Sequence, residues 1–360
     1  MPDTILSLTK KFISIRSTQE NQKALEEILD LALSNLKGYT IEKFEHNRVK
    51  SALVYNSKRR PKKFKLLLNG HLDVVPGKEN QYKPRIKGSR LYGVGSMDMK
   101  ANVACLIKTF KEVAGLVSYP LGLQLVTDEE VGGFDGTKHQ ISKGVRADFV
   151  IAGEPTNFDI VNEAKGVLCV KIFAHGKTAH GAYLWRGENA IWKMNGFLNI
   201  LRKRYPVPAR EKWATTVNLS TIESGNRSFN KIPDDCVIGL DIRYVREESD
   251  VIVKNIEKLL PKGFTLAVVV KEPALFTDDN NAYIKTLQKV GGQIIGGRIS
   301  LRGAQGSSDA RHFARVKCAG IEFGPVGGDI GGDSEWVSIP SLGKYHRILK
   351  SFLLSLNGVL

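Results

Sequence analysis

The sequence predicts an α/β fold in which a mostly parallel-sheet domain is interrupted by a smaller inserted α+β domain of the ferredoxin-like kind. Helical and strand patterns alternate in the first half, which is typical of a parallel sheet covered by helices on both faces. The middle of the chain has a β-α-β-β-α-β order instead, and helix–strand alternation returns after residue 277. A length of 360 residues also favours two domains over one hydrophobic core.

The elements of the first half follow from hydrophobic periodicity and from apolar runs. Three segments have apolar residues at helical spacing: 4–15, 21–36 and 100–115. Three others are short continuous apolar runs, as expected for strands buried on both faces: 64–70, 121–127 and 148–153.

The inserted domain is predicted from six consecutive segments. They are strand 167–176, helix 189–205, strands 215–223 and 236–244, helix 249–260 and strand 264–273. This order is that of a self-sufficient split β-α-β unit. We therefore expect residues 1–163 and 277–360 to form one domain and residues 164–276 to form the insertion.

Composition indicates an ordinary globular protein of the cytoplasm. Apolar residues make up 42% of the chain and charged residues 25%. No apolar run is long enough to span a bilayer, and the N-terminal residues lack a signal-peptide pattern. The four cysteines are far apart and form no CxxC pair, which favours reduced thiols over disulfides or a cysteine-bound metal.

The net charge of +16 is the one unusual bulk property. Lysine and arginine are spread along the chain, and no nucleic-acid-binding motif accompanies them. We interpret the charge as a general compositional bias that helps anionic substrates slightly. It predicts neither a nucleic-acid partner nor a membrane partner.

Four clusters of acidic or histidine residues occur at or near the C-terminal ends of predicted strands, where open α/β sheets build their sites. They are His71 with Asp73, Asp98, Asp128 with Glu129 and Glu130, and Glu154. Taken singly, each has an ordinary structural explanation: a packed histidine, a helix cap or a solvated acidic surface. Together, one histidine and several carboxylates are the ligand set of hydrolytic zinc.

Eight motifs, in order along the chain, resemble one known family. They are GHLDVVPG, GVGSMDMK, TDEEVGG, GEPT, GKTAHG (176–181), FNKIPDDCVIGLDIR (229–243), GSSDARHFA (306–314) and FGP (323–325). The family is the binuclear-zinc metallopeptidase and aminoacylase family that contains acetylornithine deacetylase, succinyl-diaminopimelate desuccinylase, aminoacylase-1 and carboxypeptidase G2. The resemblance spans nearly the whole chain and implies a catalytic metal-binding domain with an inserted lid and dimerisation domain.

The resemblance implies a role for five residues of the four clusters. His71 and Glu154 would hold one metal ion, and Asp98 would bridge to a second ion held also by Glu130. Glu129 would be the general base, since one of two adjacent carboxylates can bind metal while the other takes a proton from water. The peptide bond after Asp98 would be cis.

Further roles are implied for Asp73 and for residues outside these clusters. Asp73 would orient the imidazole of His71, and His180 would reach the active site of the other subunit of a homodimer to stabilise an oxyanion. Five residues would bind substrate: Asn230, Arg243, Ser308, Asp309 and Arg311. For Arg243, at the end of a strand, a surface ion pair is an equally good interpretation.

The chain departs from the family pattern at Gly331, where the family has the last metal-ligating histidine, four residues before the glutamate that corresponds to Glu335. Asp329 and Asp333 are the nearby carboxylates that can replace it. We therefore expect one tightly bound Zn²⁺ and a second ion that is weak or absent, with Co²⁺ or Mn²⁺ also acceptable.

Three functions remain open at this point. The first is a deacylase that removes an acyl group from a small N-acyl amino acid in amino-acid metabolism. The second is a di- or tripeptide exopeptidase, which would differ from the deacylase in the size of the substrate pocket in the lid. The third is a weakly active or non-catalytic relative, for which Gly331 is the only support.

Overall fold

The structure is a computed structural model that describes residues 2–358. It separates into two compact units. Unit 1 comprises Met1–Glu163, Phe276–Arg302 and Ser308–Leu360, and unit 2 comprises Ala164–Leu275 and Gly303–Ser307. None of the helices in residues 2–358 combines the length and the apolar character needed to cross a bilayer.

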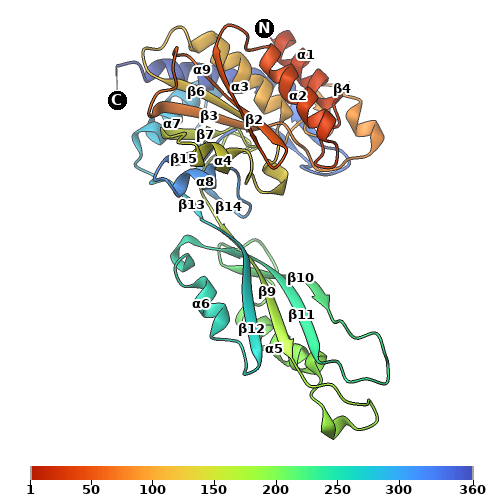
Figure 1. The fold of residues 1–360 in the computed structure, drawn as a ribbon. Helices are drawn as coiled ribbons and strands as arrows, with labels where there is room; N and C mark the ends of the chain where they lie inside the picture. Colours follow the sequence, from red (N-terminus) through yellow and green to blue (C-terminus); the bar gives the residue numbers. More distant parts are fainter. Residues whose placement is uncertain (1, 359–360) are drawn as a thin grey trace. The chain divides into compact units, whose positions relative to one another are not determined.

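Unit 1 is built on a nine-stranded sheet of order β1-β2-β6-β3-β7-β15-β8-β13, with β14 paired to β8 (Figure 1). The strands are β1 (Thr40–His46), β2 (Val49–Tyr55), β3 (Phe64–His71), β6 (Leu121–Val126), β7 (Ala147–Ala152), β8 (Ile160–Ala164), β13 (Leu275–Phe276), β14 (Leu301–Ala304) and β15 (Ala319–Glu322). The central strands β6, β3, β7 and β15 pair in parallel, whereas β1 and β2 add an antiparallel edge. The predicted α/β class with a mostly parallel sheet is confirmed.

Helices cover both faces of this sheet. They are α1 (Pro2–Ile13), α2 (Gln22–Ser34), α3 (Lys100–Val113), α4 (Thr137–Ser142), α7 (Ala282–Ile295), α8 (Ala310–Ala314) and α9 (Ile339–Ser355). Leu66 and Leu68 of β3 belong to the larger core, which includes residues of α3 and α9, whereas Leu67 belongs to a smaller core with α4. This alternation explains the continuous apolar runs, because a strand buried on both faces has no polar side.

A small antiparallel sheet in unit 1 was not predicted. Its order is β16-β17-β5-β4, from Gly327–Gly328, Trp336–Ser338, Arg90–Tyr92 and Arg85–Lys87. It joins the hairpin that contains Gly331 to the segment that leads to Asp98. Strands of two or three residues are too short to show a period in the sequence.

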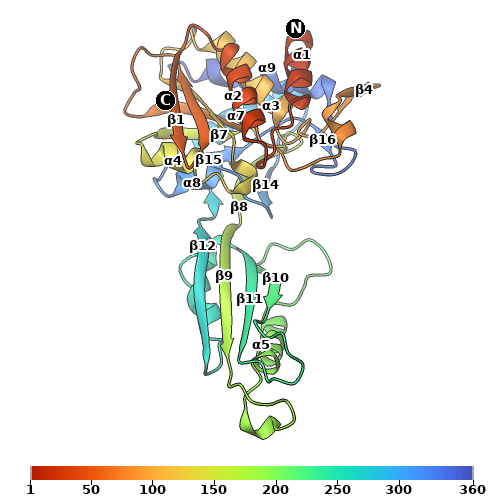
Figure 2. The ribbon, with the colours of Figure 1, turned by 45° about the vertical axis from the view of Figure 1, so that its right-hand side comes forward.

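Unit 2 is a four-stranded antiparallel sheet of order β10-β11-β9-β12 with helices α5 and α6 (Figure 2). Its elements are β9 (Gly166–His175), α5 (Ala190–Arg204), β10 (Thr216–Glu223), β11 (Asp235–Tyr244), α6 (Ile252–Glu257) and β12 (Phe264–Glu272). Alternate residues of β9, such as Val170 and Ile172, pack on Met194 and Phe197 of α5. The β-α-β-β-α-β order is the predicted one.

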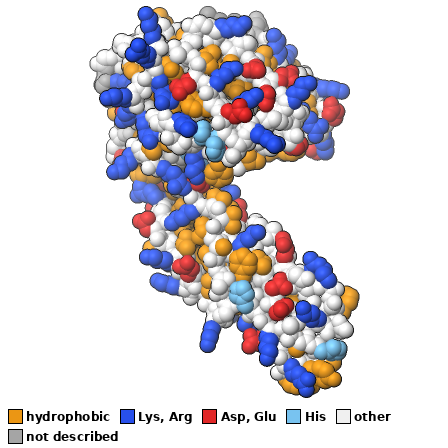
Figure 3. Space-filling model, in the orientation of Figure 1, with side chains coloured by type: hydrophobic (Ala, Val, Ile, Leu, Met, Phe, Trp, Pro, Cys, Tyr) orange, Lys and Arg blue, Asp and Glu red, His pale blue; other side chains and the backbone are white. Residues whose placement is uncertain are grey.

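Lysine and arginine side chains are spread over the visible face of each unit, with no single continuous basic surface on that face (Figure 3). This distribution agrees with the scattered positions of these residues in the sequence.

Candidate metal centre

The candidate site lies where parallel strands of unit 1 end. β3 ends at His71, which pairs with Val126, the last residue of β6, and Asp128 follows two residues later. β7 ends at Ala152, two residues before Glu154. Since adjacent parallel strands end at the same edge of a sheet, residues far apart in the sequence meet there.

Three of the four expected ligands form one group among the described residues: His71, Asp98 and Glu154, whose ligand atoms all lie within 4.8 Å of one another. Nε2 of His71 lies 3.0 Å from Oδ1 of Asp98 and 4.0 Å from Oε2 of Glu154. Oε1 of Glu154 is buried and has no hydrogen-bond partner within residues 2–358. An imidazole nitrogen, two carboxylates and an unsatisfied buried oxygen fit a divalent cation.

The electrostatics of the group also suit a cation. Burial raises the pKa of Glu154 well above its usual range, and the neighbouring carboxylates of Asp98, Glu129 and Glu322 raise it further, against the influence of His71. Burial lowers the pKa of His71, but the surrounding carboxylates outweigh this effect and raise it well above its usual value. A dication placed among these groups would balance the negative charge that the site concentrates.

Asp73 connects His71 to the pair of glutamates. Its carboxylate is fully buried and accepts hydrogen bonds from the backbone N–H groups of Glu129 (3.2 Å) and Glu130 (3.0 Å). Its carbonyl oxygen lies 3.0 Å from Nδ1 of His71. Gln19 donates to the same carboxylate at 2.9 Å. Sequence reasoning missed Gln19, because a lone glutamine in a turn has no signature.

The two glutamates have different surroundings. Oε1 of Glu129 lies 3.9 Å from Nη1 of Arg311, and Arg311 donates to the carbonyl oxygen of Gly132 at 2.7 Å. Burial raises the pKa of Glu129 well above its usual range. Burial also raises the pKa of Glu130 to about 7, but Glu130 does not belong to the three-residue group found among residues 2–358.

The loop that carries Asp98 is held by Glu335. The buried carboxylate of Glu335 accepts hydrogen bonds from the backbone N–H groups of Gly95 (3.2 Å), Met97 (2.7 Å) and Asp98 (3.1 Å). The Asp98–Met99 peptide bond is cis, as predicted. Glu335 is therefore the residue that connects the β16–β17 hairpin to the ligand group.

Gly331 has a φ of +66°, and a Cβ atom added there would have its nearest contact, Cγ2 of Val75, at 3.8 Å. The backbone at Gly331 therefore leaves room for a Cβ atom among the described residues. Oδ2 of Asp329 accepts the backbone N–H of Ser334 at 2.7 Å, and Asp333 pairs with Lys78. Both carboxylates considered as replacements have other partners.

The remaining site residues of unit 1 are buried. The hydroxyl of Ser308 is hydrogen-bonded to the carboxyl of Glu322. Oδ2 of Asp309 accepts a hydrogen bond from Thr137 at 2.5 Å, and its side chain is fully buried. Of the three residues expected to bind substrate in this segment, Arg311 has an ion-pair contact with Glu129.

Two of the expected residues of unit 2, His180 and Arg243, have local partners for their side chains. His180 and Asn230 are exposed, and Nδ1 of His180 accepts the backbone N–H of Ala182 at 3.2 Å. Arg243 forms two hydrogen bonds with the carboxylate of Asp241, at 2.9 and 3.1 Å. The ion pair that was an alternative for Arg243 is thus present.

Comparison with known proteins identifies the family. Residues 67–355 match the model described as "Peptidase family M20/M25/M40". The chain is 29% identical over 376 residues to a succinyl-diaminopimelate desuccinylase of Wolbachia pipientis, with 97% of this chain and 92% of that protein covered. It is 27% identical over 391 residues to the same enzyme of Variovorax paradoxus, with 99% and 98% covered.

The fold is shared with a tripeptidase of Staphylococcus aureus, at 19% identity and a TM-score of 0.78, with 98% of this chain and 99% of that chain covered. The family model covers most of the chain and includes every ligand of the candidate group. The chain is therefore a metal-dependent hydrolase of amide or peptide bonds, and it belongs to peptidase family M20/M25/M40.

Proposed function

We propose that this enzyme removes an acyl group from a small N-acyl amino acid. The observation that carries the proposal is the group of His71, Asp98 and Glu154 with Glu129 and Arg311 beside it. Two relatives at 27–29% identity are desuccinylases, and their similarity extends over 97–99% of this chain. The N-acyl amino acid is therefore the substrate class that we favour.

In our proposal His71, Asp98 and Glu154 hold one Zn²⁺ tightly, and Asp98 with Glu130 holds a second ion weakly. When bound, such an ion supplies Lewis-acid chemistry: it polarises the substrate carbonyl and makes water more acidic. One imidazole and two carboxylates are ligands that zinc accepts, whereas a site of carboxylates alone favours manganese or magnesium.

Glu129 performs the proton transfers. Its carboxylate accepts the proton of the attacking water and returns it to the amide nitrogen as the C–N bond breaks. Burial makes this carboxyl a stronger base than a surface glutamate, and its raised pKa lets it hold the proton between the two steps. Arg311 lies close enough to keep the carboxylate oriented. Asp73 fixes the backbone of the same segment.

Unit 2 acts as the lid and dimerisation domain in this proposal, and unit 1 as the catalytic domain. His180 is exposed and is therefore free to serve the active site of a second copy of the chain. Asn230 and Arg243 would bind the substrate carboxylate, for which Arg243 has to release Asp241. All four cysteines are free thiols, which supports a cytoplasmic location.

A substrate screen tests the proposed function. The zinc-, cobalt- and manganese-loaded proteins are incubated with N-succinyl and N-acetyl amino acids, dipeptides and tripeptides, and the released amines are quantified. We expect turnover of an N-acyl amino acid. Cleavage of peptides alone would contradict the proposal and indicate a di- or tripeptide exopeptidase. The absence of turnover with all three metals would favour a non-catalytic relative.

A further inference from the structure

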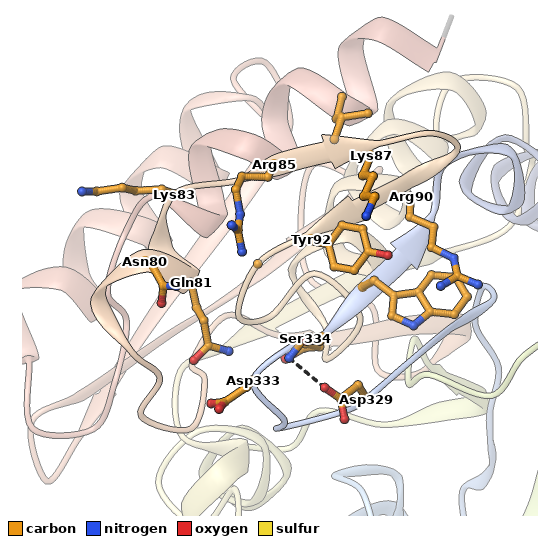
Figure 4. Close-up of a pocket in the computed structure, with 14 residues that line it drawn as sticks. Asn80, Gln81, Lys83, Arg85, Lys87, Arg90, Tyr92, Asp329, Asp333 and Ser334 are labelled. Atoms are coloured by element: carbon orange, nitrogen blue, oxygen red, sulfur yellow. Dashed lines mark hydrogen bonds between the residues drawn. The ribbon is translucent and has the colours of Figure 1, made fainter.

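A cavity of about 650 Å³ lies over the small four-stranded sheet of unit 1 (Figure 4). In the register of this sheet Arg85 is opposite Tyr92, Tyr92 is opposite Trp336, and Lys87 is opposite Arg90. Alternate residues of a strand share a face, so these five side chains lie on the same side of the sheet. All five line the cavity.

The cavity concentrates positive charge. Four cationic residues line it: Lys83, Arg85, Lys87 and Arg90. In Figure 4 the side chains of Arg85 and Lys87 extend from β4 into the cavity, whereas Lys83 points away from it. Within residues 2–358, none of the four forms an ion pair with a carboxylate, and all are exposed.

The three acidic residues that line the same cavity have other partners. Asp333 pairs with Lys78, which lies outside the lining, and Asp329 accepts the backbone N–H of Ser334. Glu335 is buried and accepts the backbone N–H groups that precede α3. None of the three carboxylates therefore pairs with the four cationic side chains of the cavity, which remain available to a ligand.

One of the cations is already held in place. The guanidinium carbon of Arg90 lies 3.8 Å from the ring centroid of Trp336. Such cation–π stacking restrains the guanidinium while its N–H groups stay available in the plane. Binding of a ligand there costs less conformational entropy, because the arginine side chain is already ordered.

We propose that this cavity binds a small polyanion, either a phosphate ester or a polycarboxylate with at least two negative charges. The volume of the cavity is in the range of small-molecule sites. It is too small to hold a segment of nucleic acid. Arginine and lysine side chains that converge from two adjacent strands recognise such groups by charge-assisted hydrogen bonds. The lining contains none of the three grouped metal ligands, so the polyanion site is separate from that group, although Glu335 in the lining also accepts the backbone N–H of Asp98.

Isothermal titration calorimetry of the metal-loaded full chain tests the proposal, with ADP, inorganic pyrophosphate and citrate as probes. The test variant is R85A/K87A. The matched control is K58A/R59A, which removes the same charge from exposed residues of the same unit. We expect at least one probe to bind the natural protein and the control equally, and to bind R85A/K87A at least about tenfold more weakly.

A preference for ADP and pyrophosphate would support the phosphate class, and a preference for citrate the carboxylate class. Binding that is unchanged in R85A/K87A would overturn the proposal, because the anion would then be held elsewhere, for example at the metal centre. Equal weakening in both variants, or no binding of any probe, would also overturn it. If R85A/K87A does not fold, the single variant Arg85→Gln replaces it. These measurements do not depend on hydrolysis, so they are independent of the proposed function.

Discussion

At the scale of single residues, Glu129 differs from its neighbour Glu130 although the two are adjacent in the sequence. Both backbone N–H groups donate to Asp73, which aligns the segment. Only Glu129 has an ion-pair contact with Arg311, at 3.9 Å. A largely buried carboxylate that is oriented by an arginine is suited to move protons.

Substituting Glu129→Gln is expected to lower kcat by about 10²–10⁴-fold, because a carboxamide cannot accept the proton of water. Metal content should stay unchanged, since the proposed function gives Glu129 the proton transfers and assigns it no metal ion. The measurement is the hydrolysis rate of the best substrate from the screen, together with elemental analysis of the dialysed protein. Normal turnover would exclude Glu129 as the base.

The second residue-scale prediction concerns Gly331→His. The site has room for a side chain, but a φ of +66° strains any residue with a Cβ by roughly 1–3 kcal/mol. We expect the variant to retain about two equivalents of zinc after extensive dialysis and the natural protein about one. Gly331→Ala is the control, because it introduces the same backbone strain without a ligand. Two equivalents in the natural protein would contradict the prediction.

At the scale of elements, the β16–β17 hairpin and the loop before α3 are joined by Glu335. Three backbone N–H groups donate to this one carboxylate, over a sequence separation of 237–240 residues. Glu335→Gln replaces one accepting oxygen by a donor that faces N–H groups. We expect metal affinity to fall about 10–100-fold, as is usual for residues that orient metal ligands. Competition with a chromogenic chelator measures it, and unchanged affinity would contradict the role.

A second element-scale prediction concerns the contact between α3 and α9. Burial raises the pKa of Glu112, but hydrogen bonds from Lys108 and Lys350, together with His346, outweigh this effect and lower the pKa to about 2. A carboxyl whose pKa is lowered in the folded state stabilises the fold at pH values above its pKa in the unfolded state, near 4.5. This stabilisation is lost as the pH falls toward about 2, the pKa in the folded state.

Glu112→Gln is therefore expected to reduce the free energy of unfolding at pH 7 by about 1–3 kcal/mol, discounted for partial solvent exposure. The difference from the natural protein should narrow as the pH is lowered from 5 toward 3. Urea denaturation at several pH values measures both quantities. Glu27→Gln, on the exposed side of α2, is the control for the loss of one surface carboxyl.

At the scale of the whole molecule, unit 2 exposes several large apolar side chains. The edge strand β10 has Leu219 and Ile222 exposed by 42% and 54%, and Trp192 of α5 is exposed by 72%. An exposed apolar edge strand is a common site of pairing between chains. We expect a homodimer through this surface.

The double variant Trp192→Glu with Leu219→Glu should be a monomer in sedimentation velocity experiments. Formation of the dimer would bury two unpaired charges of each chain in the interface, which is unfavourable. Leu116→Glu in unit 1, at a position 61% exposed, is the control and should leave the mass unchanged. A natural protein that is monomeric and fully active would contradict both the dimer and the role of His180 in the second subunit.

Several features could be predicted from the sequence because their signals are local. Apolar runs such as 121–127 and the motifs around His71 and Asp98 each lie within a few consecutive residues. Parallel strands that end at one edge then bring separate motifs together, which is why the group of His71, Asp98 and Glu154 could be expected.

The tertiary structure alone decided the features that depend on packing between distant segments. Arg311 approaches Glu129 across 182 residues, and Glu335 reaches the Asp98 loop across 237. The small sheet beneath the cationic cavity consists of strands of two or three residues, which have no period to detect. Sequence patterns report which face of an element is buried, whereas contacts between elements depend on how the whole chain packs.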